Sequence, residues 1–199
     1  MRIEGNLVHA LGMFDKNPYD GKEVDTTAKS GLWSGLSPFL LSATAYGSRN
    51  FENLWQYSKV YPEFLNKSTN LPDDTWYEWR YEGFHSLRAV RYPMGKGRVP
   101  AFSYWNGQRL SYVEARKKIY ASIYAELVEQ TEAYKRLSSL YMSTYDDNVH
   151  LVLRDYDAYD HVATGRTLKE VVNDPKRKMG HAFVLVMMLT GCLQECLSG

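Results

Sequence analysis

The chain has 199 residues, the size of one domain, and can bury a core without disulfides or a structural metal. Its 24 Lys and Arg residues nearly balance 23 Asp and Glu residues, which argues against a protein whose main activity is to coat nucleic acid or an acidic membrane. The aromatic fraction is 14%, with 16 Tyr and 5 Trp, which excludes a disordered chain. Composition leaves open whether these rings build a core, a ligand pocket or an interface.

The sequence favours a cytoplasmic protein without a membrane span. The longest apolar run, Ala182 to Leu189, is far shorter than the roughly 18 residues that a spanning helix needs, and no apolar signal segment follows the first residues. Cys192 and Cys196 lie four apart, where a helix places both on one face, and they lack further partners at a zinc-like spacing. We therefore expect ordinary reduced thiols, no metal and no cofactor.

In the first third of the chain, we expect a peripheral segment and then one prominent helix. Residues 1–30 are polar with several turn signals, and they are expected to wrap the surface or carry a short strand. The apolar run from Leu36 to Ser42 predicts a buried strand or extended segment. Ser48 or Asn50 can then cap a helix that runs until Pro62 ends it.

The middle of the chain is predicted to be irregular and then helical. Residues 71–100 mix aromatic residues with turn formers, which is typical of irregular structure that finishes in a loop. Ser111 and Glu114 form a capping box, and apolar residues recur at helical spacing from there to Tyr141. This pattern predicts a long helix, broken near Thr131.

The last third of the chain predicts one strand and two helices. Residues 149–153 indicate a short strand. Thr167 and Glu170 form a second capping box for a helix that stops before Pro175. The segment 178–189 is apolar almost all round and predicts the central core helix. Together, the elements indicate a mainly α protein, an α+β fold with a few short strands.

One helix face, in the segment 50–60, gathers polar groups that could hold a ligand. Glu52, Gln56 and Lys59 fall at helical positions i, i+4 and i+7, so they share a face, and Trp55 flanks them. A carboxylate, an amide and an ammonium beside an aromatic plane suit a polar ligand. The spacing alone favours a solvated polar stripe over a ligand site.

The arrangement Glu52-x-x-Trp55-Gln56-x-x-Lys59 resembles the signature helix of the NADAR superfamily, the YbiA-like proteins. Further segments resemble family motifs in the same order: Gly35-Leu-Ser37-Pro-Phe39, Ala89 to Gly97, Trp105-Asn106, the helix through Lys117, Asp157-Ala158-Tyr159, and Met179-Gly180-His181. The resemblance spans residues 35–189 and implies a NADAR-like core within a single domain of residues 1–199.

The chain also departs from the family pattern at specific positions. Asp160 stands where the family motif has Trp, and His161 stands where it has Gly. The segment between Lys59 and Ala89 is longer and more aromatic than in common members. The chain therefore resembles a divergent branch, in which the choice of substrate can differ.

The resemblance implies a hydrolase that breaks an N-glycosidic bond in an ADP-ribosyl or ribosyl-phosphate compound, including removal of ADP-ribose from guanine in nucleic acid. The implied partner is a nucleotide-like small molecule or ADP-ribosylated nucleic acid. A carboxylate near the anomeric carbon stabilises the oxocarbenium-like transition state or activates water, and Glu52 is the candidate. Its place near a helix N-terminus favours the ionised form. Asp157, within the acidic group of residues 155–160, is the second catalytic candidate and would hydrogen-bond the ribose hydroxyls.

The remaining candidate residues would bind the base and the phosphates. Aromatic planes can stack on a base, although core packing is favoured for any single ring. Cations near the 95–97 glycines can meet phosphates, although a solvated loop explains them equally well. The substrate-binding candidates are Ser37, Trp55, Gln56, Lys59, Tyr92, Lys96, Arg98, Trp105 and Tyr159.

Two other functions compete with the hydrolase. A non-catalytic module could bind an NAD-derived nucleotide or ADP-ribose, or counter an ADP-ribosylating toxin by direct contact, and the changed residues Asp160 and His161 motivate this alternative. A structural protein with an aromatic contact surface is the third possibility.

Overall fold

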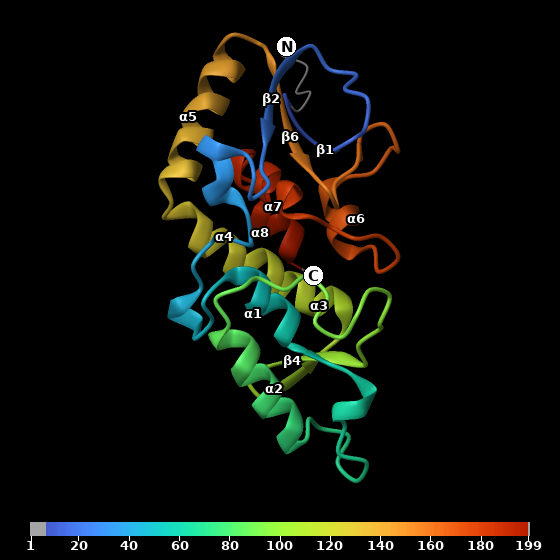
Figure 1. The fold of residues 1–199 in the computed structure, drawn as a ribbon. Coiled ribbons are helices and arrows are strands. Elements are labelled where there is room, and N and C mark those ends of the chain that lie inside the picture. Colours follow the sequence, from blue (N-terminus) through green and yellow to red (C-terminus); the bar gives the residue numbers. More distant parts are fainter. Residues whose placement is uncertain (1–6, 199) are drawn as a thin grey trace. The chain divides into compact units, whose positions relative to one another are not determined.

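The computed structural model describes residues 7–198, which form a mixed α+β fold (Figure 1). The chain divides into two compact units. The described residues of Met1–Ser37 and Tyr124–Gly199 form the first unit, and Pro38–Ile123 form the second. Because the second unit is inserted between the two segments of the first, the units are nested along the chain rather than successive. The single domain over residues 1–199 stays a prediction.

The first unit contains a three-stranded parallel sheet in the order β1-β6-β2. The strands are β1 (Val8–Gly12), β2 (Gly21–Asp25) and β6 (His150–Asp155). His9 pairs in register with Val152, and Val24 pairs with Leu153. The central strand β6 is an almost continuous buried run, as a strand covered on both faces requires. The strand predicted at 149–153 is therefore confirmed, with bounds shifted to 150–155.

Helices of the first unit complete its core. Their bounds are η1 (Gly31–Leu36, 3₁₀), α4 (Ser122–Glu129, whose first two residues belong to the second unit), α5 (Glu132–Asp146), α6 (Leu168–Asn173), α7 (His181–Leu189) and α8 (Leu193–Leu197). Helix α7, drawn in red in Figure 1, contacts β1 and β6, and its residues from His181 to Met187 are buried. The predicted core helix is confirmed. The break at Thr131 and the Thr167–Glu170 capping box are confirmed as well.

The segment 1–30 carries short strands, as one of the two predicted alternatives has it, but its predicted peripheral position needs a correction. Residues 1–6 lie outside the described residues, but β1 is completely buried, with Val8, Ala10 and Leu11 at 0% exposure. The strand flanks β6 and contacts α7, so it belongs to the core. β2 has a mostly exposed burial pattern and fits the peripheral description better. The strand β1 lies in an apolar stretch, residues 7–14, that the polar character of the whole segment 1–30 obscured.

The second unit combines three α-helices and several shorter helical segments with a small antiparallel sheet in the order β3-β4-β5. Its buried cluster consists of Val60, Tyr61, Phe64, Trp76 and Phe102. The element bounds are η2 (Thr44–Tyr46), α1 (Phe51–Tyr57), β3 (Lys59–Val60), η3 (Pro62–Phe64), α2 (Asp74–His85), β4 (Phe102–Trp105), β5 (Gln108–Leu110), α3 (Tyr112–Ala115) and the π-helical segment η4 (Arg116–Ala121).

Three predictions for the second unit and its boundary were wrong. Residues 37–42 form turns rather than a strand, and Leu40 is 57% exposed. The helix expected to run to Pro62 ends at Tyr57, because Lys59 pairs with Ser103 and starts a strand. The segment expected to be irregular contains α2, whose N-cap is Asp73. The Ser111–Glu114 capping box is confirmed, and the helix that it opens continues through η4.

Helices α1 and α2 meet closely at Gly83. A Cβ atom at this position would lie 2.1 Å from Cδ1 of the Tyr57 ring. We expect Gly83→Ala to lower the free energy of unfolding by about 1–3 kcal/mol, since overpacking against a rigid ring outweighs the better helix propensity of Ala. Urea unfolding measures the loss. The double variant with Tyr57→Leu should lose less than the two single effects together, and simple additivity would contradict this packing explanation.

Candidate functional site

The N-terminal turn of α1 positions Glu52. The side chain of Asn50 accepts a hydrogen bond from the backbone N–H of Asn53, which fixes the start of the helix. Backbone N–H groups of Phe51 and Glu52 also donate to the carbonyl oxygens of Leu41 and Pro38. These hydrogen bonds tie the preceding turn to the helix. The backbone position from which the Glu52 side chain extends is therefore fixed.

Glu52, Gln56 and Lys59 form one hydrogen-bonded line. Nε2 of Gln56 donates to Oε1 of Glu52 at 2.8 Å, and Nζ of Lys59 donates to Oε1 of Gln56 at 2.7 Å. Glu52 and Gln56 are each 6% exposed. Because an ammonium can only donate, it fixes which end of the Gln56 amide faces Lys59, and the N–H end then meets the carboxylate. Glu52 and Gln56 share one face of α1 as predicted, whereas Lys59 lies beyond the end of the helix and joins them through its ammonium.

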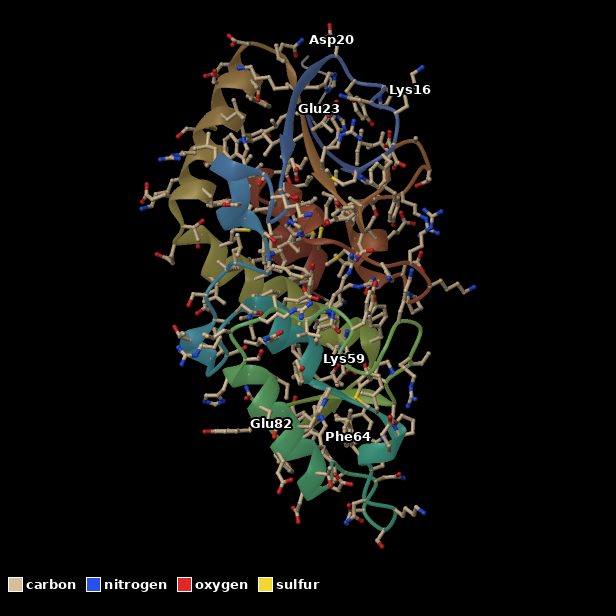
Figure 2. All side chains as sticks on the ribbon, in the orientation of Figure 1. Lys16, Asp20, Glu23, Lys59, Phe64 and Glu82 are labelled. Carbon is tan, nitrogen blue, oxygen red and sulfur yellow. The ribbon has the colours of Figure 1, made fainter. Side chains whose placement is uncertain are left out.

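Lys59 belongs to β3 rather than to α1, and both its side chain and its backbone are held in place (Figure 2). Its ammonium lies 4.7 Å from the ring centroid of Trp55, a cation–π distance. Its carbonyl oxygen accepts a hydrogen bond from Nε1 of Trp76 at 2.9 Å. The cation therefore sits against an aromatic plane at the end of the line.

The π-helical segment η4 packs against Trp55 and was not predicted. Tyr120 meets the Trp55 ring edge-to-face, with centroids 5.1 Å apart. Arg116, in the same segment, is only 1% exposed, and its Cζ lies 4.5 Å from the ring centroid of Tyr112. Such π-helical turns are frequent at functional sites, but their sequences look helical. No sequence signal distinguishes this segment from an ordinary helix.

Asn53 is a second positioning residue that the sequence reasoning missed. Its side chain is fully buried, and its Nδ2 donates to the carbonyl oxygens of Gly83 and Arg88 at 3.0 and 2.9 Å. Its Oδ1 accepts the N–H of Val90 at 2.9 Å. These bonds hold the end of α2 and the following segment against α1. The sequence offered one signal for this role. Asn53 is an amide residue next to Glu52, and it lies on a different side of α1 from the one that leads to Lys59.

The loop candidates make contacts on the surface of the second unit. Arg98 forms an ion pair with Glu63 at 2.5 Å, and both side chains are exposed. Lys96 is exposed, and Tyr92 is partly buried with the Arg91 guanidinium 5.4 Å from its ring. Arg98 therefore has a protein carboxylate as its partner. The phosphate-binding role of these residues stays a prediction.

Trp105 lies at the end of β4 and contacts other side chains than the Glu52 line. Its ring centroid is 6.3 Å from that of Tyr46 and 5.6 Å from Cζ of Arg80. Arg80 comes from α2. The structure thus places Trp105 beside Tyr46 and Arg80.

Ser37, Asp157 and Tyr159 belong to the first unit. Ser37 is buried, at 2% exposure. Asp157 is partly buried and lies 3.9 Å from Nζ of Lys178, and the Tyr159 ring lies between Phe183 and the guanidinium of Arg177, at 5.0 and 4.6 Å. The functional roles that the resemblance implies for these three residues stay predictions.

A buried ion pair of the first unit lies next to Asp157 in sequence. Oδ2 of Asp155 is 3.1 Å from Nδ1 of His181, and Nε2 of His181 is 2.9 Å from the carbonyl oxygen of Thr26. Burial by itself raises the pKa of Asp155, but the His181 charge and the hydrogen bonds from His181 and from Ala182 outweigh it, so this pKa lies below its usual value. Since a carbonyl can only accept, both ring nitrogens of His181 carry protons.

This ion pair depends on a glycine. A Cβ atom at Gly180 would lie 1.9 Å from Oδ2 of Asp155. The carboxylate also accepts the backbone N–H of Ala182 and so caps α7 from the end of β6. The sequence Gly180-His181 belongs to a motif of the resemblance, but the contact of both residues with Asp155 could be identified only from the structure.

A second polar cluster of the first unit joins His9 and His150 to Tyr19 and Asp160. Nε2 of His9 lies 2.9 Å from Nδ1 of His150, and the Tyr19 ring stacks on His9 with centroids 3.6 Å apart. The Tyr19 hydroxyl donates to Asp160 at 3.0 Å. Asp160 also accepts the N–H of Ala163, and His161 is buried against Phe183. The two residues that depart from the family motif thus have structural contacts.

The cluster predicts acid sensitivity of the first unit. Burial, and then the neighbouring His150, lower the pKa of His9 from 6.5 to about 4, against the opposing charge of Asp160 and with a further lowering by His161. The unfolded chain therefore binds a proton between pH 6.5 and pH 4 that the folded chain excludes. We expect the free energy of unfolding to fall through this range by about 3 kcal/mol in total.

Urea unfolding at a series of pH values measures this loss. His9→Gln should flatten the pH dependence between 6.5 and 4, whereas the same change at exposed His85 should leave it as in the wild type. An unchanged slope in His9→Gln would contradict the assignment.

No group of three or more His, Cys, Asp or Glu residues within 7–198 is arranged to hold a metal ion. In the same part of the chain, no helix has the length and apolar character needed to cross a membrane. The Sγ atoms of Cys192 and Cys196 are 3.8 Å apart, and burial, with Cys192 nearby, raises the pKa of Cys196 to about 12. A thiol with this pKa is a poor nucleophile at neutral pH.

A shallow surface depression lies on α2, lined by Tyr77, Glu78, Tyr81 and Glu82. None of the predicted site residues lines it.

Comparisons with family models, with curated proteins and with solved structures found no match to this chain.

Proposed function

We propose that this protein hydrolyses an N-glycosidic bond in an ADP-ribosyl or ribosyl-phosphate compound, with Glu52 as the catalytic carboxylate. The hydrogen-bonded line from Lys59 through Gln56 to Glu52 is the observation that carries the proposal. The ordered motifs that resemble the NADAR superfamily support it.

In the proposed reaction, the bond between ribose C1′ and the base nitrogen breaks, and its electron pair leaves with the nitrogen. Positive charge develops on C1′ and the ring oxygen, and water adds to C1′. Glu52 stabilises this charge or takes the proton of the attacking water, while the leaving nitrogen gains a proton. Gln56 holds one carboxylate oxygen in place, so the negative charge needs little reorganisation as the bond breaks.

The surroundings of Glu52 suit this chemistry. Trp55 is buried, at 9% exposure, and supports the line from beside it, while Lys59 adds positive charge for a phosphate. At 6% exposure, the carboxylate of Glu52 is largely shielded from bulk water, which strengthens its interaction with a developing positive charge.

A direct assay tests the function. Purified protein is incubated with ADP-ribosylated guanine in single-stranded DNA and, separately, with a ribosylaminopyrimidine phosphate, and the released ADP-ribose or ribose phosphate is quantified. Release from either substrate supports the proposal, and release from neither contradicts it.

The burial of Glu52 also favours a second candidate, a non-catalytic module that binds ADP-ribose. An enclosed carboxylate whose hydrogen bond to Gln56 is already formed can serve as a fixed acceptor for ribose hydroxyls. Calorimetry with ADP-ribose distinguishes the two candidates, because binding without release of product in the assay above indicates the module.

A further inference from the structure

Arg80, on α2, has its guanidinium next to three aromatic rings. Its Cζ lies 4.2 Å from the ring centroid of Phe84, 5.5 Å from that of Trp76 and 5.6 Å from that of Trp105. Trp76 and Phe84 lie four positions before and after Arg80, so the three share one face of the helix. Trp105 reaches this face from the end of β4. We call these four residues the Arg80 cage.

The cage supplies no anion to its cation. Within residues 7–198, Arg80 forms no ion pair, and its Nε is buried without a hydrogen-bond partner. Burial lowers the pKa of Arg80, with only a small opposing influence of Tyr77. A guanidinium carries five N–H donors in one plane, and aromatic faces that stack on this plane leave the donors at its edge unsatisfied. The N–H groups at the edge of the Arg80 guanidinium can therefore still donate to anionic oxygens that lie in its plane.

The acidic residues of α2 lie on a different side of the helix. Asp74, Glu78 and Glu82 recur every four residues and form a stripe of their own, of which Figure 2 labels Glu82. Glu78 and Glu82 are two positions from Arg80, a spacing at which helical side chains do not face each other. The cage can therefore meet an anion without a carboxylate beside it.

The charge of the second unit also favours anions. Pro38–Ile123 contain 12 Lys and Arg residues against 7 Asp and Glu residues, whereas the remaining chain contains 12 against 16. The formal net charge of +1 thus combines a basic second unit and an acidic first unit. A local excess of positive charge raises the concentration of anionic ligands near the unit.

One wall of the cage is shared with the proposed catalytic line. Nε1 of Trp76 donates to the carbonyl oxygen of Lys59 at 2.9 Å, and the side chain of Lys59 continues to Gln56 and Glu52. The cage and the proposed catalytic line are thus connected through Lys59.

We propose that the Arg80 cage binds a phosphate group of the substrate, with the edge of the guanidinium donating to two phosphate oxygens. The phosphate belongs either to the backbone of a nucleic acid strand or to the pyrophosphate of free ADP-ribose. The choice of these two sources rests on the function proposed above. The planar fork of Arg matches phosphate oxygens in pairs, which a Lys ammonium cannot do.

Two binding measurements test this site in the full-length protein. Fluorescence anisotropy uses a labelled 12-nucleotide single-stranded DNA, and calorimetry uses ADP-ribose. Arg80→Gln should weaken binding of at least one probe by about tenfold. If the strand is the source, the slope of log affinity against log salt should also fall by about 0.7.

Arg109→Gln is the matched control. It removes the same charge from the same unit, and its guanidinium also stacks on a ring, 4.2 Å from the centroid of Phe102. Its affinities should stay within about twofold of the wild type. Arg80→Lys keeps the charge but loses the planar fork, and a loss of about threefold is expected; this variant decides the test if Arg80→Gln does not fold.

The outcomes separate the sources and the alternatives. A loss confined to the strand assigns the site to a nucleic acid backbone, and a loss confined to ADP-ribose assigns it to the pyrophosphate. Equal binding by wild type and Arg80→Gln, equal losses in Arg80→Gln and Arg109→Gln, or no binding of either probe by the wild type overturns the proposal. Repeating the comparison in a Glu52→Gln background measures the site without turnover, so failure of the hydrolase and failure of the phosphate site remain distinguishable.

Discussion

Glu52→Gln is expected to lower the rate of N-glycosidic bond hydrolysis by about three orders of magnitude. Gln has nearly the same shape, and its side-chain oxygen can still accept the hydrogen bond from Gln56. The variant loses the negative charge that stabilises the developing cation on C1′ and the ability to take a proton from water. Product release under single-turnover conditions measures the effect.

Glu78→Gln provides the matched control for this variant. Glu78 is an exposed residue of α2, and its loss removes the same charge from the same unit. Its rate should equal that of the wild type, and thermal melting of both variants should match the wild type. Wild-type rates in Glu52→Gln would show that Glu52 is not the catalytic carboxylate.

Asp155→Ala is expected to lower the free energy of unfolding by about 3–5 kcal/mol. The substitution leaves the His181 imidazolium buried without its carboxylate, and it removes the acceptor for the Ala182 N–H at the start of α7. Both groups are nearly inaccessible to water, with side-chain exposures of 6% for His181 and 8% for Asp155. Urea unfolding at pH 7 measures the change.

Asp157→Ala tests whether this effect is specific to the buried pair. Asp157 lies two positions further on, and its partner Lys178 is exposed and 3.9 Å away. Exposed pairs of this kind contribute at most about 1 kcal/mol, so the variant should unfold at nearly the wild-type urea concentration. Equal losses in the two variants would contradict the role assigned to the Asp155–His181 pair.

Local sequence signals predicted several helix boundaries correctly. The capping boxes at Ser111 and Thr167 form as expected, and Thr131 caps α5 at the predicted break. These signals depend on hydrogen bonds between residues three apart, so no tertiary contact is needed to interpret them. The position of α7 was also predicted correctly, because a helix that is apolar on all sides is stable only in the core of a globular protein.

Elements that depend on distant partners were not predicted. α1 ends at Tyr57 because Lys59 pairs with Ser103, more than forty positions away. The helix α2 was missed because its aromatic residues have weak helix propensity and Gly83 lies within it, whereas packing on α1 requires a glycine there. β1 owes its burial to pairing with Leu151–Asp155 and to contact with α7.

The candidate site was predictable only in part. The shared helix face of Glu52 and Gln56 followed from spacing, but Lys59 joins their line from a strand, which the spacing did not predict. Trp105 was expected to stack on a base, but it contacts Arg80, a residue to which the sequence assigned no role. The contacts of Arg80 and Asn53 depend on how α2 packs on its neighbours. Because α2 itself was not predicted from the sequence, neither residue could be assigned a role.

A crystal structure of the Glu52→Gln protein with ADP-ribose tests the central claim most directly. The account predicts that ribose C1′ lies about 3–3.5 Å from the side chain at position 52, the distance of a reactive arrangement, with Trp55 beside the sugar. Ordered ADP-ribose bound elsewhere, with the Glu52–Gln56–Lys59 line untouched, would contradict the assignment of this line as the catalytic site.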